Sequence, residues 1–175
     1  LAFPNTYHAN NESLGKMKNM PEITSEINMM LGIANNPEVQ EQPTNSFGAK
    51  DISDLSWKNL LDAYSCTECG RCTEECPANL TGKKLSPRKI MMDTRDRAEE
   101  YGEILDKNKN PDIENFLLDS YITREEINAC TSCNACTEAC PININPLEII
   151  LELRRYVALE ESKAANEWNM MFQNI

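Results

Sequence analysis

Residues 66–77 read CTECGRCTEECP, and the same cysteine spacing returns in CTSCNACTEACP at residues 130–141. Each run has the form C-x-x-C-x-x-C-x-x-x-C-P, and together the two runs use all eight cysteines of the chain. This spacing is typical of proteins that hold two iron–sulfur clusters, in which the fourth Cys of each run binds the cluster of the other run. The two runs therefore predict two [4Fe–4S] clusters with crossed ligation.

The expected ligand sets each combine three cysteines of one run with the last cysteine of the other. The first cluster takes Cys66, Cys69, Cys72 and Cys140, and the second takes Cys130, Cys133, Cys136 and Cys76. An iron–sulfur cube needs four soft thiolates that converge from different directions, and two intervening residues let one tight loop cover three corners. Pro77 and Pro141 bend the chain directly after the last ligand, because proline fixes φ and has no N–H to donate. Each cluster should therefore join the two halves of the domain.

Other roles for the eight cysteines fit the pattern less well. Four disulfides are typical of smaller secreted scaffolds, whereas these cysteines lie in two tight groups within 175 residues. Structural zinc needs two C-x-x-C pairs per ion, which would leave the third Cys of each run without a role. A thioredoxin-like redox pair would need a βαβ pattern around it, and nothing near either run resembles one.

The charge of the chain is strongly acidic, with 17 Lys and Arg against 28 Asp and Glu and a formal net charge of −11. Two oxidised cubes with eight thiolates would add about −4, for a total of about −15. Such a charge argues against binding to nucleic acid or to anionic lipid. It is common in electron carriers whose partners present basic patches, although solubility alone explains it equally well. Thiols kept free for iron indicate a reducing compartment, hence the cytoplasm.

Composition divides the chain into three expected parts. Residues 1–50 form an extended N-terminal segment and linker, residues 51–162 the iron–sulfur domain, and residues 163–175 a C-terminal tail. A short helix is expected over residues 23–31, ended by Gly32. No stretch approaches the roughly 20 apolar residues of a membrane-spanning helix, and no signal peptide is visible. The chain begins at Leu1 rather than Met, as expected of a processed protein or of a segment of a longer one.

A helix is expected to lead into each cysteine run. Ser56 is a candidate N-cap for a helix that ends at Cys66. Thr123 and Glu126 have the spacing of a capping box for a helix that ends at Cys130. Both helices carry apolar residues at helical spacing, so the two halves of the domain share one plan.

A proline is expected to open a second helix after each run. Ser86-Pro87 begins one, and Asn145-Pro146 begins the other with Glu148 as capping-box partner. Three apolar residues of these helices should cover the clusters: Met91, Ile150 and Val157. Strand-like alternation is absent, and a turn at residues 108–111 should join the helices between the runs. The sequence thus predicts an all-α ferredoxin of repeated helix–cluster loop–helix units.

Smaller features of the sequence carry weaker signals. Gly70 and Asn134 directly follow the second Cys of each run, and at least one is expected at positive φ. The basic run Lys83, Lys84, Arg88 and Lys89 is either a solvated helix start or a docking surface for an acidic partner. The single histidine, His8, is expected to be solvated.

Residues 57–160 resemble the α-helical dicluster ferredoxin module of heterodisulfide reductase C subunits, anaerobic glycerol-3-phosphate dehydrogenase C subunits and related (Fe–S) oxidoreductases. The resemblance lies in two stretches, WKNLLDAYSCTECGRCTEECPANLTGKKLSPRKIMMDTRD at 57–96 and ACTSCNACTEACPININPLEIILELRRYVALE at 129–160. The opening LAFPNTYHA also resembles the segment that follows a membrane-embedded haem b-type domain in such fused proteins. The resemblance implies electron transfer between a quinol or haem module and a cysteine-rich catalytic domain, at the cytoplasmic face of the membrane.

Four cysteines on each cube leave no open iron, so the sequence indicates no substrate site in this chain. One alternative is a free-standing soluble ferredoxin shuttle, which a matching gene that begins with Met would favour. Another is an iron–sulfur sensor or scaffold, which differs from a carrier in losing its clusters on reduction.

Overall fold

The computed structural model describes residues 27–32, 47–107, 115–163, 170–171 and 174. The chain divides into two units, Leu1–Asn45 and Ser46–Ile175. In the first unit, residues 27–30 are helical and Gly32 follows at a φ of +67°, as the predicted helix end requires. Residues 23–26, His8 and the turn at 108–111 lie outside the described residues. The three-part division at residues 50 and 162 stays a prediction.

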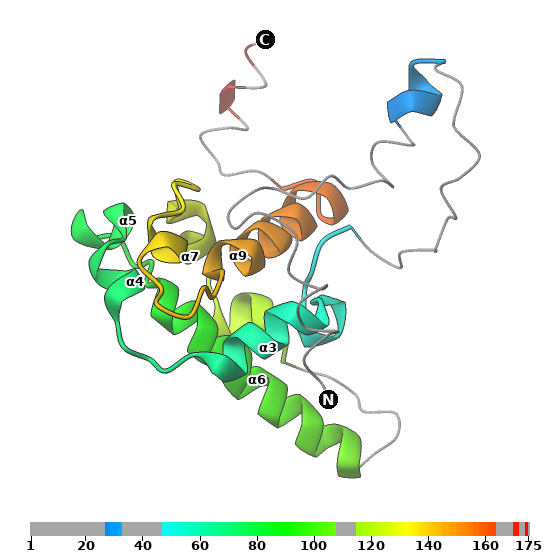
Figure 1. Ribbon diagram of the computed structural model, residues 1–175. Helices are drawn as coiled ribbons and strands as arrows, with labels where there is room; N and C mark the ends of the chain where they lie inside the picture. Colours follow the sequence, from blue (N-terminus) through cyan, green and yellow to red (C-terminus); the bar gives the residue numbers. More distant parts are fainter. Residues whose placement is uncertain (1–26, 33–46, 108–114, 164–169, 172–173, 175) are drawn as a thin grey trace. The chain divides into compact units, whose positions relative to one another are not determined.

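The described part of the second unit is helical and forms no β-strand (Figure 1). Its elements are η1 (Ile52–Asp54), α3 (Trp57–Ser65), α4 (Arg71–Glu74), α5 (Pro77–Leu80), α6 (Pro87–Lys107), η2 (Leu117–Tyr121), α7 (Arg124–Ala129), α8 (Ala135–Glu138), α9 (Pro146–Arg155) and η3 (Tyr156–Glu160). The predicted all-α class is confirmed. The long helix α6 packs against both α3 and α9, so it joins the two halves.

The predicted helix starts agree with the structure in all but one detail. Ser56 caps α3, since its hydroxyl accepts from the Asn59 N–H at 3.3 Å. The capping box of α7 is complete: the Thr123 N–H donates to Glu126 at 2.8 Å, and the Glu126 N–H donates to the Thr123 hydroxyl at 3.3 Å. Pro87 and Pro146 are the first residues of α6 and α9.

The capping box expected between Asn145 and Glu148 is wrong. The Asn145 side chain does not cap α9; its oxygen accepts from the Thr137 hydroxyl at 3.1 Å. The Asn145 N–H, which Glu148 would have bonded, donates to Asp62 at 3.3 Å. Glu148 lies instead 3.7 Å from the Lys58 ammonium. Contacts with α3 therefore replace the local cap.

The two halves repeat this side-chain contact. In the first half the hydroxyls of Thr73 and Ser86 are hydrogen bonded at 2.9 Å. Thr73 and Thr137 each follow the third Cys of a run, and Ser86 and Asn145 each precede the proline that opens the next helix. The same bond therefore ties each cysteine loop to the helix behind it.

A buried ion pair joins three elements of the core. Arg97 of α6 is fully buried and donates to both carboxylate oxygens of Asp51, at 2.9 and 2.7 Å. Asp51 also accepts from the Leu117 N–H at 3.0 Å. These bonds fix the segment before η1 against α6 and η2, beside a core of aliphatic side chains that includes Ile90, Ile149 and Leu153.

The segment before η1 also lies close against the end of α9. The Ala49 N–H donates to the Glu152 carbonyl at 3.1 Å. Gly48 has a φ of +83°, and a Cβ there would lie 2.5 Å from both the Glu152 oxygen and the Tyr156 nitrogen. Only glycine fits this close approach of two backbones without strain.

Candidate metal centres

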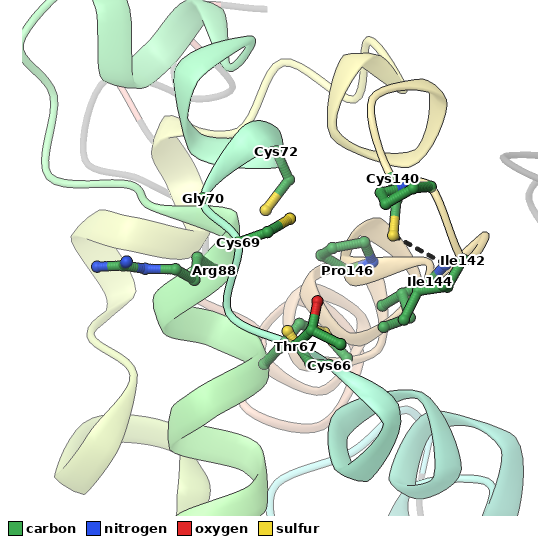
Figure 2. Close-up of a pocket in the computed structure, with 12 residues that line it drawn as sticks. Cys66, Thr67, Cys69, Gly70, Cys72, Arg88, Cys140, Ile142, Ile144 and Pro146 are labelled. Carbon is green, nitrogen blue, oxygen red and sulfur yellow. Dashed lines mark hydrogen bonds between the residues drawn. The ribbon is translucent and has the colours of Figure 1, made fainter.

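The first of two cysteine-lined cavities groups the four thiols of the first expected ligand set. Cys66, Cys69 and Cys72 come from the loop after α3 and from α4, and Cys140 follows α8. Figure 2 shows the sulfur atoms of these residues facing a common space, with Cys140 on the opposite side from the other three. The empty volume is about 380 Å³, part of which is open to solvent.

The second cavity groups the other four thiols in the same way. Cys130, Cys133 and Cys136 come from the loop after α7 and from α8, and Cys76 ends the first run. This cavity has an empty volume of about 300 Å³. Each cavity thus collects three cysteines of one run and the last cysteine of the other. Their assignment as iron ligands remains a prediction.

Apolar side chains from both halves complete each cavity. Met91 and Pro146 line the first cavity, and Pro87 and Ile150 line the second. The proline that opens each helix therefore covers the cavity of the opposite run. Val157 does not line either cavity; it is partly buried against the hydrophobic core.

Left-handed backbone turns shape both cysteine loops. Gly70 has a φ of +86° and Asn134 a φ of +65°, which confirms the prediction for these positions. Glu68 and Ser132 also have positive φ, at +58° and +56°. The sequence did not indicate these two, because neither Glu nor Ser favours that region.

Backbone N–H groups of the second run point at sulfur. The Ser132 N–H donates to the Cys130 sulfur at 3.4 Å, and the Ile144 N–H donates to the Cys140 sulfur at 3.4 Å. Such bonds stabilise thiolates and, where a cluster is bound, influence its reduction potential. The loop geometry therefore suits anionic sulfur.

Burial differs among the thiols. Burial raises the pKa of Cys72 and Cys130, and raises the pKa of Cys136 to about 11. A thiol of this kind is protonated at neutral pH unless a metal binds its sulfur in place of the proton. Cys69 and Cys133, by contrast, are exposed. Each cavity thus has one thiol edge that reaches solvent.

The residues present fit an iron–sulfur cube. Each cavity offers four sulfur donors and an apolar lining, which is the donor set that such clusters prefer. Nowhere in the described residues do three Cys, His, Asp or Glu side chains converge closely enough for a single metal ion. The four thiols of each set surround a cavity instead.

Comparison with known proteins gives the family of this part of the chain. Residues 65–144 match the family model of the 4Fe-4S dicluster domain. This segment is a 4Fe-4S dicluster domain. It carries two [4Fe–4S] clusters and eight cysteines to serve them.

The relatives of the chain include oxidoreductases and polypeptides of heterodisulfide reductases, which confirms the resemblance noted in the sequence. The "probable iron-sulfur-binding oxidoreductase FadF" of Bacillus subtilis is 34% identical over 154 residues, covering 70% of this chain and 22% of that protein. The EtfAB:quinone oxidoreductase of Syntrophomonas wolfei is 35% identical over 151 residues, covering 74% and 21%. A ferredoxin/F(420)H(2)-dependent CoB-CoM heterodisulfide reductase polypeptide from Methanosarcina acetivorans is 36% identical over 101 residues, covering 57% and 49%.

The chain therefore spans about a fifth of the first two relatives and about half of the third. Among the described helices of the chain itself, none has the length and apolar composition needed to cross a membrane.

Two arginines behind the cysteine loops were missed in the sequence. Arg95 of α6 donates to Glu68 at 2.6 Å, and Arg154 of α9 donates to the Ile127 carbonyl at 2.7 Å and to the Cys130 carbonyl. A signal was present, since each arginine lies eight residues after the proline that opens its helix.

Proposed function

We propose that the dicluster domain transfers electrons one at a time between its two clusters, as a module of a larger oxidoreductase. The observation that carries the proposal is the pair of cavities, each with four thiols and one exposed thiol edge. Four thiolates per cube leave no iron open to a substrate, so the chemistry left to these clusters is electron transfer.

The proposed ligands of the first cluster are Cys66, Cys69, Cys72 and Cys140, and those of the second are Cys130, Cys133, Cys136 and Cys76. Their grouping in the two cavities supports this crossed arrangement. The cavities are also close together. After burial, the charges of neighbouring thiolates raise the pKa of Cys136, and these include Cys72 of the other set. Helices α4 and α8, which carry these two cysteines, pack against each other. A short path of this kind suits electron transfer from cube to cube.

The partners in this proposal are a quinol or haem b module on one side and a cysteine-rich catalytic domain on the other. The name of the EtfAB:quinone oxidoreductase supports a quinone partner, and the chain matches only a fifth of that protein. Quinones reside in membranes, so the proposed location is the cytoplasmic face of the membrane. The alternative of a free-standing ferredoxin shuttle differs in needing no attached partner.

Anaerobic preparation and redox titration test the electron-transfer role. The chain should hold eight iron and eight sulfide, and both clusters should accept and release one electron without loss of iron. Loss of iron on the first reduction would contradict a carrier and favour a sensor. Stoichiometric zinc without labile sulfide would contradict the clusters themselves.

Replacement of Cys76 tests the crossed ligation. In Cys76→Ala, the cube held by Cys130, Cys133 and Cys136 should degrade, while the first cube keeps its four irons because Cys140 still completes it. A structure of the loaded protein should place the Cys76 sulfur about 2.3 Å from an iron of the second cube. Bonding of Cys76 to the cube held by Cys66 would overturn the pairing but not the cluster-binding role.

A further inference from the structure

Two arginines occupy matching places behind the two cysteine loops. Arg95 in α6 and Arg154 in α9 each lie eight residues after the helix-opening proline. Each guanidinium reaches the residue two positions after the first Cys of a run, Glu68 in one half and Ser132 in the other. Both of those residues have the same left-handed φ, +58° and +56°. The scaffold therefore repeats, but the chemical nature of the contact does not.

In the first half the positive charge is neutralised. Arg95 Nη2 lies 2.6 Å from Glu68 Oε1, and Arg95 Nε lies 3.7 Å from Asp96. The Arg95 side chain is 23% exposed and the Glu68 side chain 38% exposed. A cube beside this loop therefore faces an ion pair of no net charge.

In the second half the guanidinium meets only neutral acceptors. Arg154 donates to the Ile127 carbonyl at 2.7 Å, to the Cys130 carbonyl, and to the Ser132 hydroxyl at 3.5 Å. Within the described residues no carboxylate forms an ion pair with Arg154. Its charge already acts on the thiols, because Arg154 lowers the pKa of Cys130 against the larger, opposing effect of burial.

An uncompensated positive charge stabilises the reduced form of a nearby cluster more than the oxidised form, since reduction adds one negative charge. The effect is strong where burial limits screening by water and ions, and Arg154 is half-buried. We infer that Arg154 gives the cluster of Cys130, Cys133, Cys136 and Cys76 the higher reduction potential, so that electrons pass from the first cluster to the second. The inference rests on the proposed ligation and gives a direction to the proposed electron transfer.

Other charges near the cavities do not reverse this order. The Arg88 side chain lines the first cavity, but it is exposed and its guanidinium points away from the thiols (Figure 2). Water therefore screens it. Arg71, Glu74 and Glu138 line an open groove between α4 and α8, the helices that carry Cys72 and Cys136, so they act on both clusters alike.

A reciprocal exchange of Glu68 and Ser132 tests the inference. In redox titrations followed by EPR on the anaerobic loaded protein, Ser132→Glu should lower the wave of higher potential and leave the other wave in place. Glu68→Ser should raise the wave of lower potential. Each change should alter the distribution of one electron between the cubes by about tenfold, which corresponds to about 59 mV for a one-electron couple. Because each variant moves a different wave, the waves are assigned without a separate label.

Variants of the arginines separate charge from loop positioning. Arg154→Gln should lower the higher wave as Ser132→Glu does, whereas Arg154→Lys, which keeps the charge, should retain most of the wild-type potential. Arg88→Gln serves as the control for an exposed charge and should move neither wave by as much. The inference is overturned if Ser132→Glu moves the lower wave, or if Arg88→Gln shifts a wave more than Glu68→Ser does. Failure of the proposed function would look different, since no reversible pair of waves would then be seen in the wild-type protein.

Discussion

Replacement of Gly48 by alanine tests whether the segment before η1 is held by a close backbone contact. The φ of +83° at Gly48 lies in the left-handed region, and the added Cβ would lie 2.5 Å from the Glu152 oxygen and the Tyr156 nitrogen. Both are backbone atoms at the end of α9 and the start of η3, so neither can rotate away. The segment itself must move.

The magnitude follows from a comparison with Gly82, which has a φ of +79° and no atom within 4 Å of its added Cβ. Alanine at such a φ costs about 1–2 kcal/mol, and the reduced freedom of the unfolded chain offsets about 0.4–1 kcal/mol. Gly82→Ala should therefore cost about 1 kcal/mol. Gly48→Ala also gives up the hydrogen bond from Ala49 to Glu152, worth about 1 kcal/mol, and part of the burial of Ile52, worth about another 1 kcal/mol. Its total is about 3 kcal/mol.

Hydrogen–deuterium exchange on the anaerobic loaded protein measures this difference locally. A loss of about 3 kcal/mol accelerates exchange of the Ala49 amide by roughly a hundredfold. Gly82→Ala should leave that amide unchanged and accelerate exchange only around its own turn, by less than tenfold. Equal effects of the two variants on the Ala49 amide would refute the close contact as the reason for glycine at position 48.

Two further variants test the buried charges. Asp51→Asn should lower the free energy of unfolding by about 3 kcal/mol, because it leaves the fully buried Arg97 without its counter-ion; urea titration measures this, and adding Arg97→Met should recover part of the loss. Glu126→Gln should cost about 1–2 kcal/mol at pH 7, since the Thr123 N–H and the Lys89 ammonium outweigh burial and lower the pKa of Glu126. That contribution is complete above the unfolded pKa of about 4.3 and is lost as the pH falls through the folded value, so the urea midpoints of wild type and variant should converge below about pH 4. A gap that stays constant down to pH 3 would contradict this assignment.

The features that sequence alone predicted are those with a local physical cause. Ser56, Thr123 and Glu126 cap helices through bonds that span only three residues, and Pro87 and Pro146 begin helices because of their own fixed φ. The all-α class follows from these signals and from the absence of strand-like alternation. The two [4Fe–4S] clusters follow from spacing along the chain, which is equally local.

The features that sequence did not predict depend on residues far apart in the chain. Asp51 and Arg97 are 46 residues apart, and nothing in either neighbourhood indicates that they meet. The Asn145 N–H bonds Asp62, 83 residues away, and this contact takes the place of the expected bond to Glu148. A capping signal at the start of α9 therefore gave way to a tertiary contact, which local propensity cannot foresee.

The repeated plan of the domain explains why two nearly equal sites arise, and the exceptions to it explain how they can differ. Thr73 and Thr137 make the same bond in each half, and each cavity has the same thiol arrangement. A strictly symmetric pair of sites would give two equal potentials and no preferred direction for the electron. The exchange of Glu68 for Ser132 changes a single charge without disturbing the backbone, since both keep the same left-handed φ. A difference of this kind gives the pair of clusters a direction while the fold that holds them stays the same.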